Sequence, residues 1–317
     1  MCGPVKLSSY RRLTHVTKVL DLGTPGGVAQ AQVFGIIIPM QDVSARFRGT
    51  QQLLGEDAFA RVARASVCIV GLGGVGSWCV EALARSGVGA LTLVDLDEVC
   101  ETNINRQVHA LSTTVGRSKA ELLGERVALI NPECTITVVK KFFSAATAES
   151  ILMNSFDLVI DTIDRNENKT LLLAECVARG IPAITVGAGG NRRDATSATV
   201  VDLAKTIHDP LLQIVRKQLR QQYGFPNGER SKFHIPCVYA PLQRGPRVQE
   251  APGEACAADV RGRKSCNDGL GSAVYVTGIL GFMAAAEAVR ILGEELPAVP
   301  YPWVAKRAAA LAVEPSS

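Results

Sequence analysis

The sequence has no pair of cysteines in the CxxC spacing. Its nine cysteines are odd in number, and several of them lie within apolar runs. Both features argue against a disulfide framework and favour reduced thiols, as in a cytosolic or matrix compartment. Because four-cysteine zinc sites are built from such pairs, the sequence also argues against a zinc site of this kind.

A large excess of charge of either sign is also lacking. Lys and Arg together number 34 and Asp and Glu number 30, and 47% of the residues are hydrophobic. This is the composition of an ordinary globular protein, and 317 residues are enough for one or two domains. The sequence pI of about 8.6 is compatible with an RNA partner but does not indicate one.

One uncharged stretch, residues 269–286, is long enough to be considered as a membrane span. It is rich in Gly, Ala, Ser and Thr, and Asp268 and Glu287 bound it closely. Small residues allow close contact between helices, so the composition favours a buried or interface helix and no membrane span.

Apolar runs and helical spacing alternate along most of the chain, with no internal repeat. This alternation predicts an α/β, Rossmann-like, doubly wound and mostly parallel sheet with one antiparallel edge and a C-terminal helical and loop extension. We expect a strand–helix–strand unit at about 66–95, strands at 135–139, 158–160, 180–186, 199–202 and 238–239, and helices at 53–63, 119–130, 171–178 and 210–223.

The chain divides into a main domain, residues 45–295, an N-terminal extension, 1–44, and a C-terminal tail, 296–317, that we expect to be poorly ordered. In the extension, Arg11, Arg12 and Lys18 precede the first acid, Asp21. Such a segment is compatible with mitochondrial targeting, with an unstructured extension, or with a start at Met40. A cytoplasmic enzyme is the main expectation, with targeting as the alternative.

A glycine-rich turn follows the first strand of the unit at 66–95, with glycines at Gly71, Gly73, Gly74 and Gly76. The first glycine permits a tight turn, the second lets backbone N–H groups approach a phosphate, and the last lets helix and strand pack closely. Asp95, at the end of the second strand, is placed to accept hydrogen bonds from ribose hydroxyls. The pattern predicts a nucleotide site.

Polar residues of a particular kind follow this acid: Asp97, Asn103, Arg106, Gln107 and then Lys119. An enzyme that transfers hydride does not need cations and amides beside its nucleotide, whereas attack at a phosphorus atom of a triphosphate does. An NAD-binding oxidoreductase is therefore the weaker reading. Taken singly, each residue also has a structural explanation. Lys119, for example, could form an ion pair along its own helix with Glu121 or Glu125.

The pattern GxGGxG, LVDLDEV, NxNRQ and VGxxKA resembles the ubiquitin-activating-like adenylyltransferases of the ThiF/MoeB/HesA family. Five further segments resemble one branch of it, the dehydratases that act on threonylcarbamoyladenosine in tRNA: RFRGT at 46–50, NPEC at 131–134, DTID at 161–164, DLAKT at 202–206 and DPL at 209–211. The resemblance covers about residues 46–292.

The resemblance implies ATP-dependent adenylation of a carboxylate, followed by ring closure with loss of water. It implies that Asp95 binds ribose, that Arg106 and Lys119 contact phosphates, and that Asp164 holds Mg²⁺. Arg46 would reach the ATP of a partner subunit, which makes a homodimer the active unit. A monovalent cation and docking of sulfur-relay proteins stay open. So do two alternatives: a sulfur-carrier adenylyltransferase, and an inactive adaptor.

Three further features have both a structural and a functional interpretation. The glycine turn at 187–190 either closes the sheet or lines an acceptor pocket. The basic helix at 210–223, with Arg192 and Arg193 before it, either contacts tRNA phosphates or is a solvated face. Cys237 and Cys266 are interpreted as structural, with a reactive thiol as the alternative.

Overall fold

The computed structural model describes residues 43–228, 230–242, 271–294, 301, 302 and 304, and four short strands before them. These strands are β1 (Tyr10–Arg12), β2 (Val16–Val19), β3 (Gln30–Val33) and β4 (Ile37–Pro39). The sequence did not predict them. The rest of the extension, Cys266, and most of the C-terminal tail lie outside the described residues.

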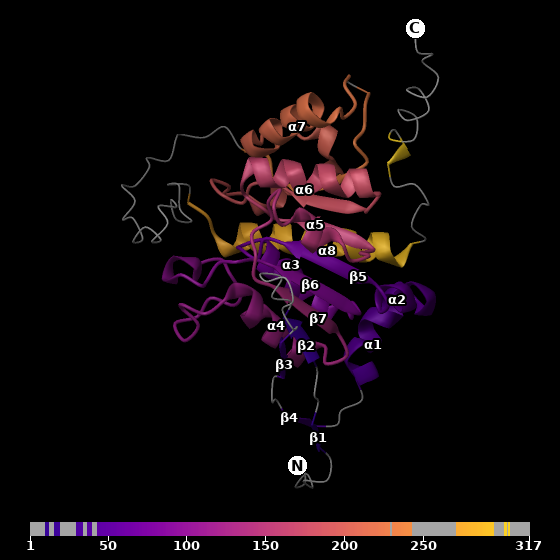
Figure 1. The fold of residues 1–317 in the computed structure, drawn as a ribbon, viewed down its shortest axis with the longest axis vertical. Helices are drawn as coiled ribbons and strands as arrows, with labels where there is room; N and C mark the ends of the chain where they lie inside the picture. Colours follow the sequence, from indigo (N-terminus) through magenta and orange to yellow (C-terminus); the bar gives the residue numbers. More distant parts are fainter. Residues whose placement is uncertain are drawn as a thin grey trace.

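A nine-stranded sheet in the order β10-β11-β9-β8-β5-β6-β7-β2-β3 forms the centre of the molecule (Figure 1). Its inner strands are parallel, and both edge pairs, β10–β11 and β2–β3, are antiparallel. The sequence predicts the first of these edges and misses the second. The strands not yet given are β5 (Ser66–Val70), β6 (Ala90–Val94), β7 (Thr135–Val139), β8 (Leu158–Asp161), β9 (Ala183–Val186), β10 (Thr199–Asp202) and β11 (Pro236–Tyr239).

Helices cover both faces of the sheet, so the fold has three layers. One core cluster joins the sheet to α2 (Glu56–Val62), α3 (Gly76–Arg85), α4 (Lys119–Ile130) and α8 (Val274–Gly293). The other joins it to α5 (Ala148–Leu152), α6 (Asn166–Arg179) and α7 (Pro210–Tyr223). In Figure 1, α7 and α6 lie next to each other at the top, and β1 and β4 lie at the bottom. The predicted α/β fold with a doubly wound sheet is confirmed.

Two boundaries differ from the sequence-based expectation. The helix expected at 53–63 is divided between α1 (Val43–Leu54) and α2, because Gly55 between them has φ = 83°. In the tail expected to be poorly ordered, Tyr301 is buried, and its hydroxyl donates a hydrogen bond to the carbonyl of Ile181 at 2.8 Å. Tyr301 and the partly buried Val304 thus hold this part of the tail on the core.

Within the described part of the chain, α8 alone is long and apolar enough to cross a membrane. Its side chains at Val276, Leu280 and Ala284 are buried, and it packs closely on α3. A Cβ atom added at Gly281 would lie 2.6 Å from the carbonyl oxygen of Val75. This is the close contact through small residues that the sequence predicts for a buried helix.

Candidate functional site

The glycine-rich turn lies at the carboxyl end of β5, against the residues that follow β8. Gly71 has φ = 91°, a left-handed conformation that favours glycine. A Cβ atom added at Gly71 would lie 3.0 Å from the carbonyl oxygen of Thr162, and one at Gly76 would lie 1.9 Å from that of Gly71. Side chains are therefore excluded from both positions by backbone atoms, and the turn is held close to the sheet.

Asp95 fixes this turn to the end of the neighbouring strand. Its carboxylate accepts hydrogen bonds from the N–H of Leu72 at 2.6 Å and of Asp97 at 2.8 Å. Burial raises the pKa of Asp95, while the positive charge of Lys119 acts in the opposite direction. The carboxylate is thus in place beside the turn, where it can also accept hydrogen bonds from a sugar.

Lys119 is the first residue of α4, and Ser118 caps that helix. Its ammonium lies 3.2 Å from the carboxylate of Asp97, and its side chain is almost fully buried. The alternative pairings along the helix do not occur, since Glu121 pairs with Lys140 and Glu125 with Arg117. A buried ammonium is therefore held at the edge of the sheet that carries the glycine turn.

Arg106 lies on the loop between β6 and α4, which α3 and α8 hold in place. Its carbonyl accepts hydrogen bonds from Trp78 Nε1 at 3.0 Å and Thr277 Oγ1 at 3.5 Å. Its guanidinium donates to the Thr102 carbonyl at 2.8 Å. A Cβ atom added at Gly74 would meet Arg106 Cγ at 3.3 Å, so this arginine adjoins the glycine turn. No sequence motif indicated a role for Trp78 or Thr277.

Two buried amides on the loop that carries Arg106 have atoms with no hydrogen-bond partner among the described residues, Asn103 Nδ2 and Gln107 Oε1. Gln107 faces the turn, because a Cβ atom at Gly73 would lie 3.9 Å from its Nε2. A buried polar atom without a partner costs roughly 1–3 kcal/mol, so such atoms point to a ligand that supplies the missing bonds. Amides, cations and an open glycine together fit the phosphates and ribose of a nucleotide.

Asp164 lies three residues beyond β8 on the same edge and is exposed. It is not the cap of α6, because Arg165 occupies that position. No group of three His, Cys, Asp or Glu side chains that would hold a metal occurs among the described residues. The residues present fit Mg²⁺, which proteins often hold through one or two carboxylates together with the phosphates of a substrate.

The segment that carries Asp164 is anchored by a fully buried ion pair between Asp161 and Lys169. Lys169 Nζ lies 2.8 Å from Asp161 Oδ2, and neither side chain is exposed. Asp161 also accepts hydrogen bonds from Thr185 Oγ1 at 2.7 Å and from the N–H of Ile163 at 3.0 Å. Lys169 Nζ donates in turn to the carbonyl of Ile163 at 3.0 Å. Both charges therefore bind the backbone just before Asp164.

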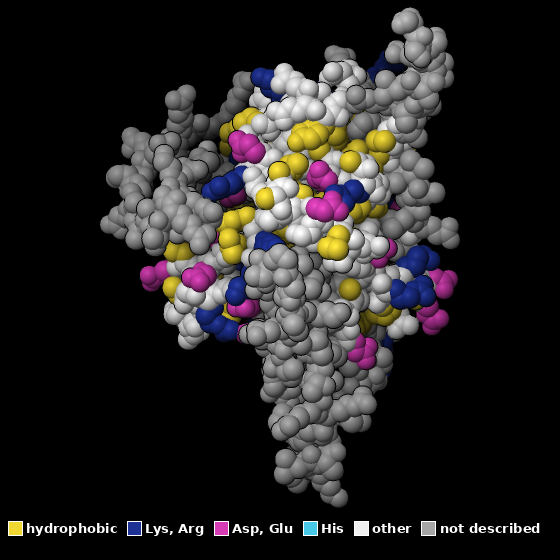
Figure 2. All heavy atoms as spheres, in the orientation of Figure 1, with side chains coloured by type: hydrophobic (Ala, Val, Ile, Leu, Met, Phe, Trp, Pro, Cys, Tyr) yellow, Lys and Arg dark blue, Asp and Glu magenta, His cyan; other side chains and the backbone are white. Residues whose placement is uncertain are grey.

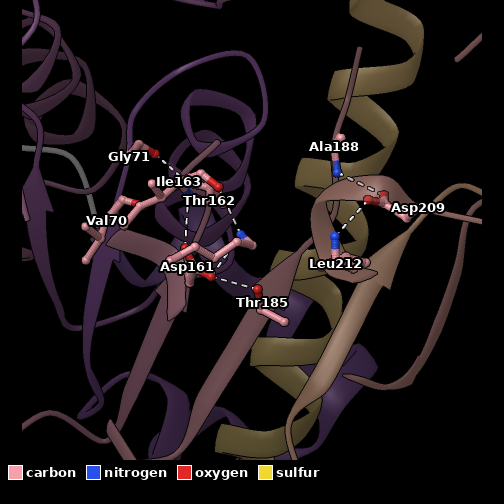
Figure 3. Close-up of polar contacts among 10 residues, drawn as sticks. Val70, Gly71, Asp161, Thr162, Ile163, Thr185, Ala188, Asp209 and Leu212 are labelled. Carbon is pink, nitrogen blue, oxygen red and sulfur yellow. Dashed lines mark hydrogen bonds and ion pairs between the residues drawn. The ribbon is translucent and has the colours of Figure 1, made fainter. Parts of the chain in front are cut away.

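A second buried pair, Arg192 with Asp209 at 2.9 Å, holds the glycine turn at 187–190. Asp209 accepts hydrogen bonds from the N–H groups of Ala188 at 3.2 Å and Leu212 at 3.0 Å, the latter capping α7 (Figure 3). Arg192 is 7% exposed, so the interpretation of this arginine as a contact to tRNA is wrong. A buried guanidinium needs an opposite charge beside it, and the carboxylate of Asp209 supplies that charge inside the protein.

Arg46 lies apart from these residues. Its guanidinium donates hydrogen bonds at 2.9 Å to the carbonyl oxygens of Leu129 and Ile130, at the last turn of α4. Lys119 begins that helix, and at about 1.5 Å per residue its two ends are roughly 16 Å apart. The remaining candidate residues gather at one edge of the sheet, and Arg46 does not join them within its own chain.

Cys237, the described candidate for a reactive thiol, lies in the core and not at this edge. Cys237 is fully buried in β11, and burial raises the pKa of its thiol. Burial also raises the pKa of Cys79 and of Cys134 to about 12. These groups are therefore protonated and inaccessible at neutral pH, which fits the structural interpretation of Cys237.

His109 is a buried base between the site and the core, and it gives a pH prediction. It is 4% exposed, and burial, with Lys119 and Arg126 nearby, lowers its pKa to about 3. The unfolded chain binds this proton below about pH 6.5 and the folded chain does not, so stability falls as the pH falls from 6.5 toward 3. Between pH 7 and pH 5, the free energy of unfolding should therefore fall by about 2 kcal/mol less in His109→Gln than in the wild type. Urea unfolding at the two pH values measures this difference.

His208→Asn is the matched control, because His208 is exposed and the exchange also removes one imidazole. The control variant should keep the pH dependence of the wild type. Equal pH dependence in His109→Gln and wild type would contradict the assignment of His109 as a neutral buried base.

The comparison with known proteins extends over most of the chain. Residues 47–308 match the ThiF family. The chain belongs to the ThiF family. Within this family, the chain is 41% identical over 254 residues to the tRNA threonylcarbamoyladenosine dehydratase of Haemophilus influenzae. The aligned region covers 80% of this chain and 95% of that protein.

Solved structures agree with this placement in the ThiF family. The crystal structure of the Escherichia coli tRNA N6-threonylcarbamoyladenosine dehydratase TcdA in complex with ATP has a TM-score of 0.69 and 37% sequence identity, and it covers 86% of this chain and 99% of that one. The same enzyme in complex with AMP also has a TM-score of 0.69. The expected resemblance to the dehydratase branch of the ThiF family is thus confirmed.

Proposed function

We propose that this protein binds ATP and cyclises N6-threonylcarbamoyladenosine in tRNA through an acyl-adenylate. The observation that carries the proposal is the edge where unpartnered buried amides, Arg106 and Lys119 surround the glycine turn, in a chain similar along most of its length to dehydratases of this name. The cytoplasm is the compartment that fits this substrate, with mitochondrial targeting by residues 1–44 as the alternative.

The chemistry requires a carboxylate to attack the α-phosphorus of ATP although both are negatively charged. Arg106 and Lys119 would neutralise the charge that moves onto pyrophosphate, while Asn103 and Gln107 would fix the phosphates without adding charge. Asp95 would bind the ribose, and Asp164 would hold Mg²⁺, which supplies further charge neutralisation when bound. The threonine carboxylate becomes a mixed anhydride with AMP and releases pyrophosphate.

Ring closure completes the reaction. A neighbouring nucleophilic atom of the same modification attacks the activated carbonyl, loses its proton, and displaces AMP, so that one water is lost overall. The nucleophile belongs to the substrate, so no enzyme thiol is needed, in agreement with the burial of Cys237. A monovalent cation and sulfur-relay partners are not required by this scheme.

The experiment is mass analysis of nucleosides under mild, non-alkaline conditions. Purified protein, ATP and Mg²⁺ are incubated with tRNA that carries threonylcarbamoyladenosine, and we expect loss of one water from that nucleoside only when ATP is present. An unchanged nucleoside would contradict the proposal. ATP–pyrophosphate exchange with a carrier protein ending in diglycine would then favour the sulfur-carrier alternative.

We further propose a homodimer in which Arg46 completes the ATP site of the partner subunit. The support is its position at the far end of α4 from Lys119, outside the site of its own chain. Arg46→Ala and Asp164→Asn should each be inactive alone. A mixture that re-assembles at random should recover about a quarter of wild-type activity, because half the dimers then have one intact site. No recovery on mixing would contradict action across the interface.

A further inference from the structure

The outer face of α7 carries a cluster of positive charge. The helix contains Arg216, Lys217 and Arg220 and no Asp or Glu. Within the described part of the chain, none of these three cations forms an ion pair. Lower on the face shown in Figure 2, by contrast, Lys and Arg side chains are interspersed with Asp and Glu side chains. Charge on α7 is therefore left for a ligand from outside the chain.

These cations line two adjoining cavities, which we call the α7 groove. One measures about 530 Å³ and is lined by Gln213, Arg216, Lys217, Arg220, Gln221 and Asn227. The other, of about 510 Å³, shares Arg216, Arg220 and Asn227 and extends to Ala204 and Lys205 of η4 (Leu203–Lys205). Among the described lining residues every charged side chain is a cation, and the amide side chains supply further hydrogen-bond donors.

The two arginines are held in place before any ligand binds. Arg216 donates hydrogen bonds to the carbonyl and the hydroxyl of Thr206. The guanidinium of Arg220 lies 5.2 Å from the ring centroid of Phe233 and donates to the carbonyl of Pro226 at 3.3 Å. Burial and the charge of Arg220 both lower the pKa of Arg216. An anion would relieve this repulsion, and a guanidinium suits phosphate oxygens in particular.

The groove lies outside the candidate nucleotide site, on a helix that begins at the same edge of the sheet. Asp209 caps α7 beside the glycine turn at 187–190, so the helix begins at the same edge of the sheet as the site. With a rise of about 1.5 Å per residue, Arg216 lies about 10 Å and Arg220 about 16 Å along the axis from Asp209. A substrate much longer than one nucleoside would reach from that edge onto α7, which lies beside α6 in Figure 1.

We propose that the α7 groove binds backbone phosphates of the tRNA that flank the modified nucleoside. The inference rests on the proposed function, because that function makes tRNA the substrate. Phosphate contacts of this kind position an RNA without reading its sequence, and amides such as Gln213 and Asn227 suit the ribose 2′-hydroxyl beside each phosphate. The groove thus extends the substrate site beyond the nucleoside that reacts.

Lys217→Glu tests the groove with least risk to the fold, because Lys217 is exposed and carries no hydrogen bond within the described structure. The Kd of unmodified tRNA and the KM of modified tRNA should both rise about tenfold. The slope of log affinity against log salt concentration should become shallower by the amount that corresponds to about one phosphate contact or more. The kcat and the KM of ATP should stay unchanged. Gln213→Glu, one helical turn earlier and also exposed, should act in the same direction.

Arg64→Glu is the control, since Arg64 is exposed beside the amino end of β5 and the exchange changes the charge equally. Unchanged tRNA affinity in Lys217→Glu would overturn the proposal, and so would an equal loss of tRNA affinity in Arg64→Glu. Either result would do so even if the groove were found to bind an acidic protein in place of tRNA. Binding is measured without turnover. A wild-type protein that binds tRNA through the groove but does not dehydrate it would contradict the proposed function alone.

Discussion

Asp164→Asn is expected to lower ATP-dependent AMP formation by about 10²–10³-fold with no loss of folding stability. The exchange keeps the size of the side chain and removes the charge that would hold Mg²⁺. Because Asp164 is exposed and forms no ion pair within the described part of the chain, the Tm should not change. The measurements are release of AMP from ATP with modified tRNA, over a range of Mg²⁺ concentrations, and thermal unfolding.

Glu133→Gln is the matched control, because Glu133 is exposed on the turn between α4 and β7, at the opposite edge of the sheet. It should retain full activity. Arg106→Ala is expected to resemble Asp164→Asn, with a loss that added Mg²⁺ does not restore. Wild-type activity in either variant would show that the site has been assigned to the wrong residues.

Lys169→Met is expected to cost about 3–5 kcal/mol of folding stability, because it leaves the carboxylate of Asp161 buried without its partner charge. In a protein of this size the Tm should fall by roughly 6 °C or more. Both side chains have no exposed surface, so water cannot replace the lost ammonium. Urea and thermal unfolding measure the effect.

The double variant Asp161→Asn with Lys169→Met distinguishes a coupled pair from two separate contacts. It should be more stable than Lys169→Met alone, because no uncompensated charge is left inside. Lys140→Met is the control: its pair with Glu121 is 45% exposed on the lysine side, so less than about 1 kcal/mol should be lost. Additive losses in the double variant would contradict the assignment.

The sequence predicts those parts of the fold that depend on local signals. Apolar spacing gives the bounds of α4 correctly, and the apolar run at 158–160 ends at Asp161 as expected. The glycines, Asp95, Arg106 and Lys119 could be placed at one edge because parallel strands carry their following residues to the same side of a sheet.

Pairings across the fold could not be predicted in this way. Arg192 and Asp209 pair in the core although they are 17 residues apart in sequence. From the sequence, two adjacent arginines before a basic helix suggest a surface. Only the antiparallel pairing of β10 and β11 and the placing of α7 bring the two charges together. The position of Arg46 at the end of α4 likewise depends on how α1 packs against the rest of the fold. Local sequence patterns do not predict that packing.

The carboxylate of Asp209 also determines how the glycine turn at 187–190 moves. The same group caps α7, pairs with Arg192 and binds the N–H of Ala188. Local opening of the turn would expose a buried charge and release the first turn of a helix, so its free energy is tied to that of the surrounding core. Although it is rich in glycine, this turn opens with the core and does not fluctuate as an independent loop.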